Sequence, residues 1–218
     1  MGAKAKENEA LISKGFISLA SYPSEELGAL RRREYGRTPS FSVVNPDAVD
    51  WTDGDDNSIV LAAWDEKSTA IATMRAQILW SLEELEDTVE SEFSNCNLTW
   101  PVMALSRAAT DRAYQEVGLN SVLRFYFFSF ALSWHVAHVV GAVYVGSPRT
   151  QLMAKLGYEF YSSANPGRDC LLVPKGTSLS AVLDLRTSGE KALQILRDQT
   201  SQCFNDYPWC GDIPDRPW

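Results

Sequence analysis

MALSRAATDRAYQEVGLNSVLRFYFFSFALSWHVAHVVGAVYVGSPRTQLMAKLGY, the stretch from Met103 to Tyr158, decides the fold. Its apolar pattern predicts, in order, a strand, a glycine-containing turn, a long buried helix, a second strand and a short helix. Two neighbouring strands joined by a crossover helix lie parallel in one sheet. The stretch therefore predicts a sheet that contains one parallel pair.

The turn Gln115–Asn120 (QEVGLN) lies between the first of these strands and the long helix. Backbone N–H groups exposed at such a turn, together with the helix dipole, can bind a phosphate. By itself the turn indicates only that an anion can bind there.

Further strands and helices are predicted on both sides of this stretch. Ser58–Trp64 and Ser68–Ile78 are apolar runs separated by a short polar turn, which predicts a strand pair. Ser81–Phe93 is acidic and amphipathic, so we expect a surface helix there. Leu179–Leu185 fits a short helix or a strand, and Ser188–Gln199 predicts a helix. These elements together predict a mixed α/β (α+β) fold.

The two ends of the chain are less regular. Ser24–Glu34 predicts a helix with Ser24 as its N-cap, two glutamates in its first turn and arginines in its last turn, and we expect Gly36 to end it. Glu7–Leu19 is weakly helical in pattern, and the tail Cys203–Trp218 shows no periodicity.

Phe125–Val145 raises the question of a membrane span, because its 21 residues carry no charged side chain. The alternative is a buried helix followed by a buried strand. The second half, Val139–Val145, is β-branched and contains glycine, which is typical of a central strand. We therefore expect no membrane span.

Composition excludes several classes of function. The 218 residues include 20 Lys and Arg against 28 Asp and Glu, and a net charge of −8 argues against nucleic-acid binding across the surface. Four cysteines and two histidines lack the spacing of a metal site, so we expect no metal. The first residues lack the apolar core of a signal peptide, so we expect a cytoplasmic protein with free thiols.

The turn resembles the acyl-CoA pyrophosphate loop of the GCN5-related N-acyltransferase superfamily. That loop follows a strand, reads Q/R-x-x-G-x-G/A and opens a helix; Gln115, Gly118 and Asn120 occupy its three positions. Leu156-Gly157-Tyr158 is similar to the residues that close the superfamily's last short helix. The resemblance implies a mixed, mostly antiparallel central sheet flanked by helices, with one parallel pair.

Within that superfamily the chain is most similar to acyl-homoserine lactone synthases and N-acyl amino acid synthases. The landmarks are an arginine closing a strand (Thr73-Met74-Arg75), a long insert, Ser106-Arg107 on the next strand, and an acidic loop containing Asp53 and Asp56. The resemblance implies transfer of an acyl, and in particular a fatty acyl, group from acyl-CoA or acyl carrier protein to the amine of a small amino-acid-like acceptor. It implies no permanently bound cofactor, since the acyl thioester is a co-substrate.

The resemblance covers roughly residues 30–165 and implies a set of site residues, while the tail after Pro174 is not explained by it. We expect an acyltransferase-like domain at 1–175, with a helical N-terminal part at 1–39, and a C-terminal extension at 176–218 that packs on it. We expect a break in strand pairing near Leu105–Ala108, where free amides hold the thioester. The expected donor-binding residues are Leu105, Arg107, Ala108, Gln115, Val117, Gly118, Leu119 and Asn120. The expected acceptor-binding residues are Asp53, Asp56, Arg75 and Arg107.

Arg75 and Arg107 each interrupt an apolar strand, which leaves two roles open. Their guanidinium groups can bind the carboxylate of an amino-acid acceptor, or form a structural ion pair with Asp53 or Asp56. Arg112, Arg124, Arg149 and Lys155 surround the turn and can attract CoA or an acidic carrier protein.

The proton acceptor is not assigned by the resemblance. The lactone synthases carry a glutamate where this chain has Ala104, and many acetyltransferases carry a tyrosine where it has Met153. Glu90, Glu92, Asp111 or water remain as candidates. Two other functions therefore stay open: an acetyl-CoA-dependent N-acetyltransferase of a small amine, and a non-catalytic acyl-thioester-binding module.

Overall fold

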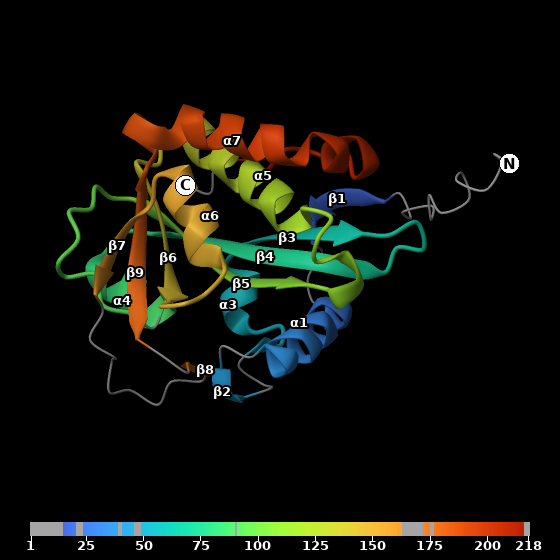
Figure 1. Ribbon diagram of the computed structural model, residues 1–218, viewed down its shortest axis with the longest axis horizontal. Helices are drawn as coiled ribbons and strands as arrows, with labels where there is room; N and C mark the ends of the chain where they lie inside the picture. The colour runs from blue at the N-terminus through green and yellow to red at the C-terminus, as the bar shows by residue number, and fades with distance from the viewer. Residues whose placement is uncertain are drawn as a thin grey trace, which may run out of the picture.

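The computed structural model describes residues 15–20, 24–38, 41–45, 49–89, 91–162, 172–174 and 177–215. A seven-stranded sheet has the order β1-β3-β4-β5-β6-β9-β7, and a small second sheet pairs β2 with β8 (Figure 1). The strands are β1 Phe16–Leu19, β2 Phe41–Val44, β3 Ile59–Trp64, β4 Ala70–Leu79, β5 Val102–Thr110, β6 His138–Tyr144, β7 Glu159–Ser162, β8 Leu172–Pro174 and β9 Ser178–Asp184. The helices are α1 Glu25–Arg37, α3 Asp53–Asp56, α4 Leu82–Val89, the 3-10 turn η1 Arg112–Tyr114, α5 Leu119–Ser133, α6 Arg149–Leu156 and α7 Leu185–Asp206.

The predicted fold class is confirmed. All pairs in the large sheet are antiparallel except β5–β6, which is parallel and is joined by α5. Helices α5, α6 and α7 cover one face of the sheet, and α1, α3 and α4 lie on the other (Figure 1).

Helix α5 is buried because its apolar residues point both to the sheet and to α7. Leu123 and Phe127 belong to the main hydrophobic core, while Phe125 and Tyr126 pack their rings against Phe204 of α7. The Phe125–Val145 run is thus divided between a helix that ends at Ser133 and a strand that begins at His138, as expected. Within the described ranges, no helix has the length and apolar character needed to cross a membrane.

Helix α1 begins where the sequence predicts. The Ser24 side chain accepts a hydrogen bond from the N–H of Leu27, which satisfies one of the free donors of the first turn. Gly36, expected to end the helix, lies inside it, and the helix continues to Arg37. Leu27 and Leu30 pack against the sheet, so α1 is held under β4 and β5.

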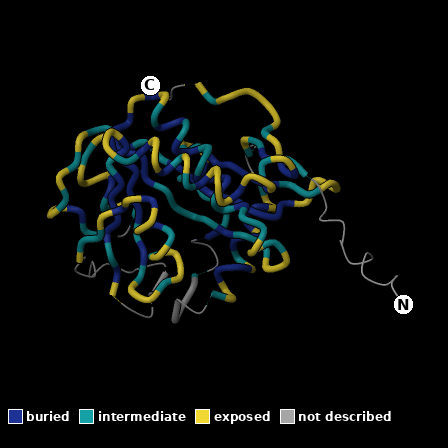
Figure 2. Tube along the Cα trace, turned by 45° about the horizontal axis from the view of Figure 1, so that its top comes forward, coloured by how far each residue is buried: buried dark blue, intermediate teal, exposed yellow. Residues whose placement is uncertain are grey.

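The structure corrects two sequence predictions and decides a third question that the sequence left open. Phe16–Leu19 is strand β1, not helix, because it pairs antiparallel with β3. Ser178–Asp184 is strand β9, inserted between β6 and β7, which decides the open choice between helix and strand. The C-terminal helix runs on to Asp206, and the chain after it lies beside β1, where Ile17 donates to the carbonyl of Pro208. Figure 2 shows buried backbone at the centre of the molecule and exposed turns around it.

His138 is a buried structural residue, and the described cysteines are free thiols. The Nδ1 atom of His138 accepts a hydrogen bond of 3.1 Å from the N–H of Thr99, and its side chain is buried. Cys96, Cys203 and Cys210 are free thiols, and Cys170 lies outside the described residues. Across the described part of the chain, no group of three or more His, Cys, Asp or Glu is placed to hold a metal.

Candidate functional site

The parallel strands β5 and β6 separate along their length. They pair only between Val102–Ala104 and His138–Val140; beyond this, β5 stays paired with β4 and β6 with β9. At the point of separation the strands are close, since a Cβ on Gly141 would lie 3.1 Å from the carbonyl oxygen of Leu105. The result is a V-shaped opening in the middle of the sheet.

A β-bulge in β5 accompanies this opening. Thr73 pairs with Ala109 but Arg75 pairs with Ser106, so Arg107 and Ala108 together face Met74. Arg107 has φ of +52°, a left-handed conformation that costs a non-glycine residue about 1–2 kcal/mol. The predicted break in strand pairing at Leu105–Ala108 is therefore confirmed.

The glycine turn lies at the open end of the V. Gly118 has φ of +94° and is the N-cap of α5; its carbonyl accepts hydrogen bonds from the N–H groups of Ser121 and Val122. The first N–H groups of an α-helix have no partner within the helix, so those at the start of α5 can bind an anion. The N–H of Val117, one of the predicted phosphate donors, instead donates to the carbonyl of Tyr114 at 3.2 Å.

A cavity of about 510 Å³ lies between the separated strands, the glycine turn, α6 and α1. Four of the predicted donor-binding residues line it: Ala108, Gln115, Gly118 and Asn120. Leu105, Arg107, Val117 and Leu119 are not among the lining residues, and the side chain of Leu119 is buried in the core. The cavity also receives Tyr144 from β6, Arg149 and Leu152 from α6, Glu34 and Tyr35 from α1, and Thr38 directly after α1.

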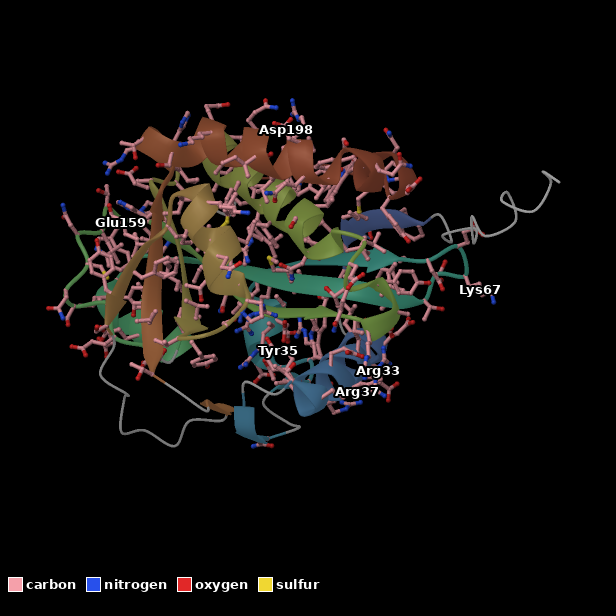
Figure 3. The ribbon with its side chains drawn as sticks, viewed as in Figure 1. Arg33, Tyr35, Arg37, Lys67, Glu159 and Asp198 are labelled. Carbon is pink, nitrogen blue, oxygen red and sulfur yellow. The ribbon has the colours of Figure 1, made fainter. Side chains whose placement is uncertain are left out.

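The contribution of α1 to this cavity was missed by sequence reasoning. No motif in the helix sequence signals it, because it depends on α1 packing under β4 and β5. Figure 3 shows Arg33, Tyr35 and Arg37 together on α1, below β5 in that view.

The basic residues near the turn differ in their surroundings. Arg149 is exposed and its Nη2 atom lies 3.4 Å from the carbonyl oxygen of Ala108, at the cavity. Arg124, by contrast, is buried and its Nη1 atom donates to the hydroxyl of Tyr158 at 3.2 Å. Arg124 therefore does not contribute to a basic surface, contrary to expectation.

A second group of charges lies on the α1 side of the sheet. Asp55 of α3 accepts a 2.8 Å hydrogen bond from Arg31, and its other oxygen is 3.8 Å from Nη1 of Arg75. The Nε of Arg75 also donates to Ser106 Oγ at 3.0 Å. The pKa of Arg75 is lowered from 12.5 to about 10, first by burial and then by the charge of Arg107.

The predicted ion-pair partner of Arg75 is wrong by one or two positions. The single turn of α3 directs Asp55 inward, with 2% of its surface exposed, and leaves Asp53 and Asp56 exposed. Asp56 instead accepts a hydrogen bond from the indole N–H of Trp51 at 2.7 Å. A helix of one turn is too short for hydrophobic periodicity to show which of its residues points inward, so the sequence could not identify Asp55.

This group carries more positive than negative charge. Asp55 is the buried carboxylate between Arg31 and Arg75, and Arg107 lies close enough to Arg75 to affect its pKa. Within the described ranges, the buried Nε and Nη2 of Arg31 and the Nε of Arg107 have no hydrogen-bond partner. Unpaired buried donors on cations are costly, and a carboxylate is the group that pairs with them most strongly.

The three candidate proton acceptors fall in different places. Glu90 lies outside the described residues. Glu92 contacts β9 through a hydrogen bond from Ser180 to its carbonyl oxygen, and it does not line the cavity. Asp111 caps η1 and accepts from Arg33, so it ties α1 to the end of β5.

Ala104 and Met153 leave no proton-transfer group at the two expected positions. Ala104 is fully buried in an apolar cluster beside Val102 and Val140. Met153 is 5% exposed and belongs to the core under α6. At both positions an apolar side chain packs in the hydrophobic core.

Comparison with solved structures establishes the fold. A CoA-dependent acyl-homoserine lactone synthase, BjaI, with SAM and isopentyl-CoA superposes with a TM-score of 0.61 at 16% identity, over 92% of this chain and 96% of that one. The chain has the fold of the GCN5-related N-acyltransferases. FeeM, an N-acyl amino acid synthase from uncultured soil microbes, superposes with a TM-score of 0.54 at 10% identity, over 86% of this chain and 96% of that one.

An N-acetyltransferase from Staphylococcus aureus Mu50 superposes with a TM-score of 0.55 at 13% identity, over 79% of this chain and 99% of that one. No protein-family model matches the sequence, and no curated protein sequence matches it. The structural similarity therefore rests on the arrangement of strands and helices, at identities too low to transfer residue roles.

Proposed function

We propose that this chain is an N-acyltransferase that moves an acyl group from acyl-CoA or acyl carrier protein to the amine of a small amino-acid-like acceptor. The observation that carries the proposal is one cavity bounded by both the separated β5–β6 edges and the left-handed glycine turn of α5. A pantetheine arm is an extended amide chain with a phosphate at one end, and this cavity offers a free strand edge leading to a helix N-terminus.

The chemistry that this arrangement supports is direct attack of an amine on a thioester. The strand edge and the turn would fix the thioester, so that attack becomes effectively unimolecular. Backbone N–H groups at the β5 bulge would polarise the carbonyl oxygen as charge develops on it. The amine nitrogen then forms the C–N bond, the C–S bond breaks, and the thiol departs.

The cluster of Arg31, Arg75 and Arg107 supports a carboxylate-bearing acceptor. It lies on the α1 side of β4 and β5 and has buried donors without partners in the described part of the chain. Asp53 and Asp56 remain candidates for the outer edge of this region, since both are exposed on α3.

Incubation of the purified protein with decanoyl-CoA, decanoyl-acyl carrier protein or acetyl-CoA and a pool of the twenty amino acids, followed by mass spectrometry, tests the proposal. We expect an N-acyl amino acid product with a decanoyl donor. Absence of product with every donor would contradict the proposal. The variant Arg107→Gly removes a guanidinium while suiting the positive φ, so we expect a raised KM for the acceptor and unchanged calorimetric affinity for the donor.

Two observations keep other functions under test in the same assay. Similarity to an N-acetyltransferase supports an acetyl donor, which would give N-acetyl products and little decanoyl product. The apolar side chains of Ala104 and Met153 support a non-catalytic acyl-thioester-binding module, which would bind decanoyl-CoA without any turnover.

A further inference from the structure

Glu34 of α1 is the carboxylate residue in the wall of the cavity, as far as the structure describes that wall. Its side chain is only 6% exposed, although burial of a carboxylate is unfavourable in itself. A carboxylate is withdrawn from water only where hydrogen bonds or cations compensate for the lost solvation. The contacts that compensate Glu34 therefore indicate what else it can bind.

Those contacts fall on one of its two oxygens. Oε1 accepts from the Nε of Arg33 at 3.0 Å and from Nη1 of Arg37 at 3.4 Å; among the described residues Oε2 has no such contact. Arg33 is shared with Asp111, and the side chains of Arg33 and Arg37 are 39% and 58% exposed. Water screens partly exposed ion pairs, so the two arginines orient the carboxylate more than they neutralise it.

The position of Glu34 relative to the arginine cluster matters for an acceptor. Arg31 and Glu34 are three residues apart on α1, and residues at that spacing share a face with about 5–6 Å between their Cβ atoms. Tyr35, the next residue, also lines the cavity. Glu34 thus lies in the cavity wall about one helical turn from Arg31, the residue that α1 contributes to the buried arginine cluster.

We propose that Glu34 binds the amine of the acceptor in this cavity and accepts the proton that the bound ammonium must lose before its nitrogen can attack. The inference rests on the proposed N-acyl transfer and deepens it. The neutral nitrogen then forms the C–N bond to the thioester carbon, the C–S bond breaks, and the second proton of the nitrogen passes to the departing thiolate. Glu34 releases its proton to water, which returns it to its charged form. The pairing of the arginine cluster with Glu34 selects a zwitterionic acceptor, of the α-amino acid class.

The test compares Glu34→Gln with Glu25→Gln, which makes the same chemical change at an exposed position on the same helix. The acceptor probe is the amino acid that gives most product with the wild-type protein, and its 2-hydroxy acid counterpart serves as a competitive probe without an amine. Loss of a general base lowers a rate by about 10²- to 10⁴-fold, so we expect kcat/KM for the acceptor to fall by that factor in Glu34→Gln. Glu25→Gln should match the wild type.

Three further readouts separate this role from a structural one. Decanoyl-CoA affinity, measured by calorimetry, should be the same in Glu34→Gln and the wild type. The wild type should bind the amino acid more tightly than the 2-hydroxy acid, and Glu34→Gln should lose that preference. Glu34→Asp, which keeps the charge, should recover part of kcat and serves as the readout if Glu34→Gln does not fold.

Several results would overturn the inference while leaving the proposed function intact. In each case the wild-type protein turns over. The overturning results are an unchanged kcat/KM in Glu34→Gln, a Glu34→Gln variant that still prefers the amino acid over the hydroxy acid, or equal kcat values for Glu34→Asp and Glu34→Gln. Absence of any N-acyl product from the wild-type protein would instead refute the proposed function, and the inference with it.

Discussion

Replacement of Asp55 by alanine tests the charge arrangement under the sheet. Asp55 is 2% exposed, pairs with the fully buried Arg31 and lies within 3.8 Å of the nearly buried Arg75. Removing one partner of a buried ion pair typically costs about 3–5 kcal/mol, because the remaining charge stays buried and uncompensated. Here two guanidinium groups lose their carboxylate, so we expect the upper half of that range.

A local term adds to this cost. The side chain of Asp55 accepts a hydrogen bond of 3.0 Å from the N–H of Thr52, as part of a capping box at the start of α3. Loss of a cap costs about 0.5–2 kcal/mol. For a chain of this size 1 kcal/mol shifts the melting temperature by about 2–4 °C, so the melting temperature should fall by more than about 8 °C.

The assay is urea-induced unfolding followed by circular dichroism, with Asp53→Ala as the matched control. Asp53 belongs to the same single turn but is exposed, so its replacement should change the free energy of unfolding by no more than about 0.5 kcal/mol. A loss below 1 kcal/mol for Asp55→Ala, or equal losses for the two variants, would refute the reasoning that Asp55 compensates the arginine cluster.

Three other variants or treatments probe separate parts of the structure. Gly118→Ala should lower the free energy of unfolding by about 1–2 kcal/mol because of its left-handed φ, and should also weaken acyl-CoA binding. Gly146 has a similar φ but no neighbour within 4 Å, so Gly146→Ala should leave the calorimetric acyl-CoA affinity unchanged. Equal acyl-CoA affinities in both variants would contradict a role of the Gly118 turn in donor binding. Gly36→Ala, inside α1 with no atom within 4 Å of the added Cβ, should raise the free energy of unfolding by about 0.4–1 kcal/mol in urea titrations, and a loss of stability would contradict the helical assignment. Burial raises the pKa of Cys203 to about 12 and that of Cys96 to about 11. At pH 8 iodoacetamide should therefore label the exposed Cys210 first and Cys203 only on unfolding, which peptide mass mapping can follow. Early labelling of Cys203 would refute its burial.

The glycine turn and the break in strand pairing beside it could be predicted from the sequence. The glycine of the turn, the break in β5 and the all-round apolar character of α5 are local features, set by residues a few positions apart. A glycine in left-handed conformation and a helix N-terminus follow from backbone geometry, which local sequence controls directly. Gly157, predicted as the C-cap of α6, has the expected φ of +96° for the same reason.

The arrangement of charges on the α1 side of the sheet depended on contacts between distant segments. Asp55 rather than Asp53 or Asp56 faces Arg75 because α3 packs against the sheet in one rotational setting. Glu34 reaches the cavity because α1 lies under β4 and β5, whose pairing joins residues as far apart as Ala72 and Thr110.

The sequence by itself therefore determined the order of strands and helices around Met103–Tyr158, the glycine turn at the start of α5 and the fold class. Only the tertiary structure decided which carboxylates are buried, which residues of α1 enter the cavity, and that β9 lies between β6 and β7. Periodicity and turn chemistry act over one or two turns of chain. Whether a charged side chain can be buried depends on compensating groups from several segments of the chain, and folding of the sheet brings these groups around it.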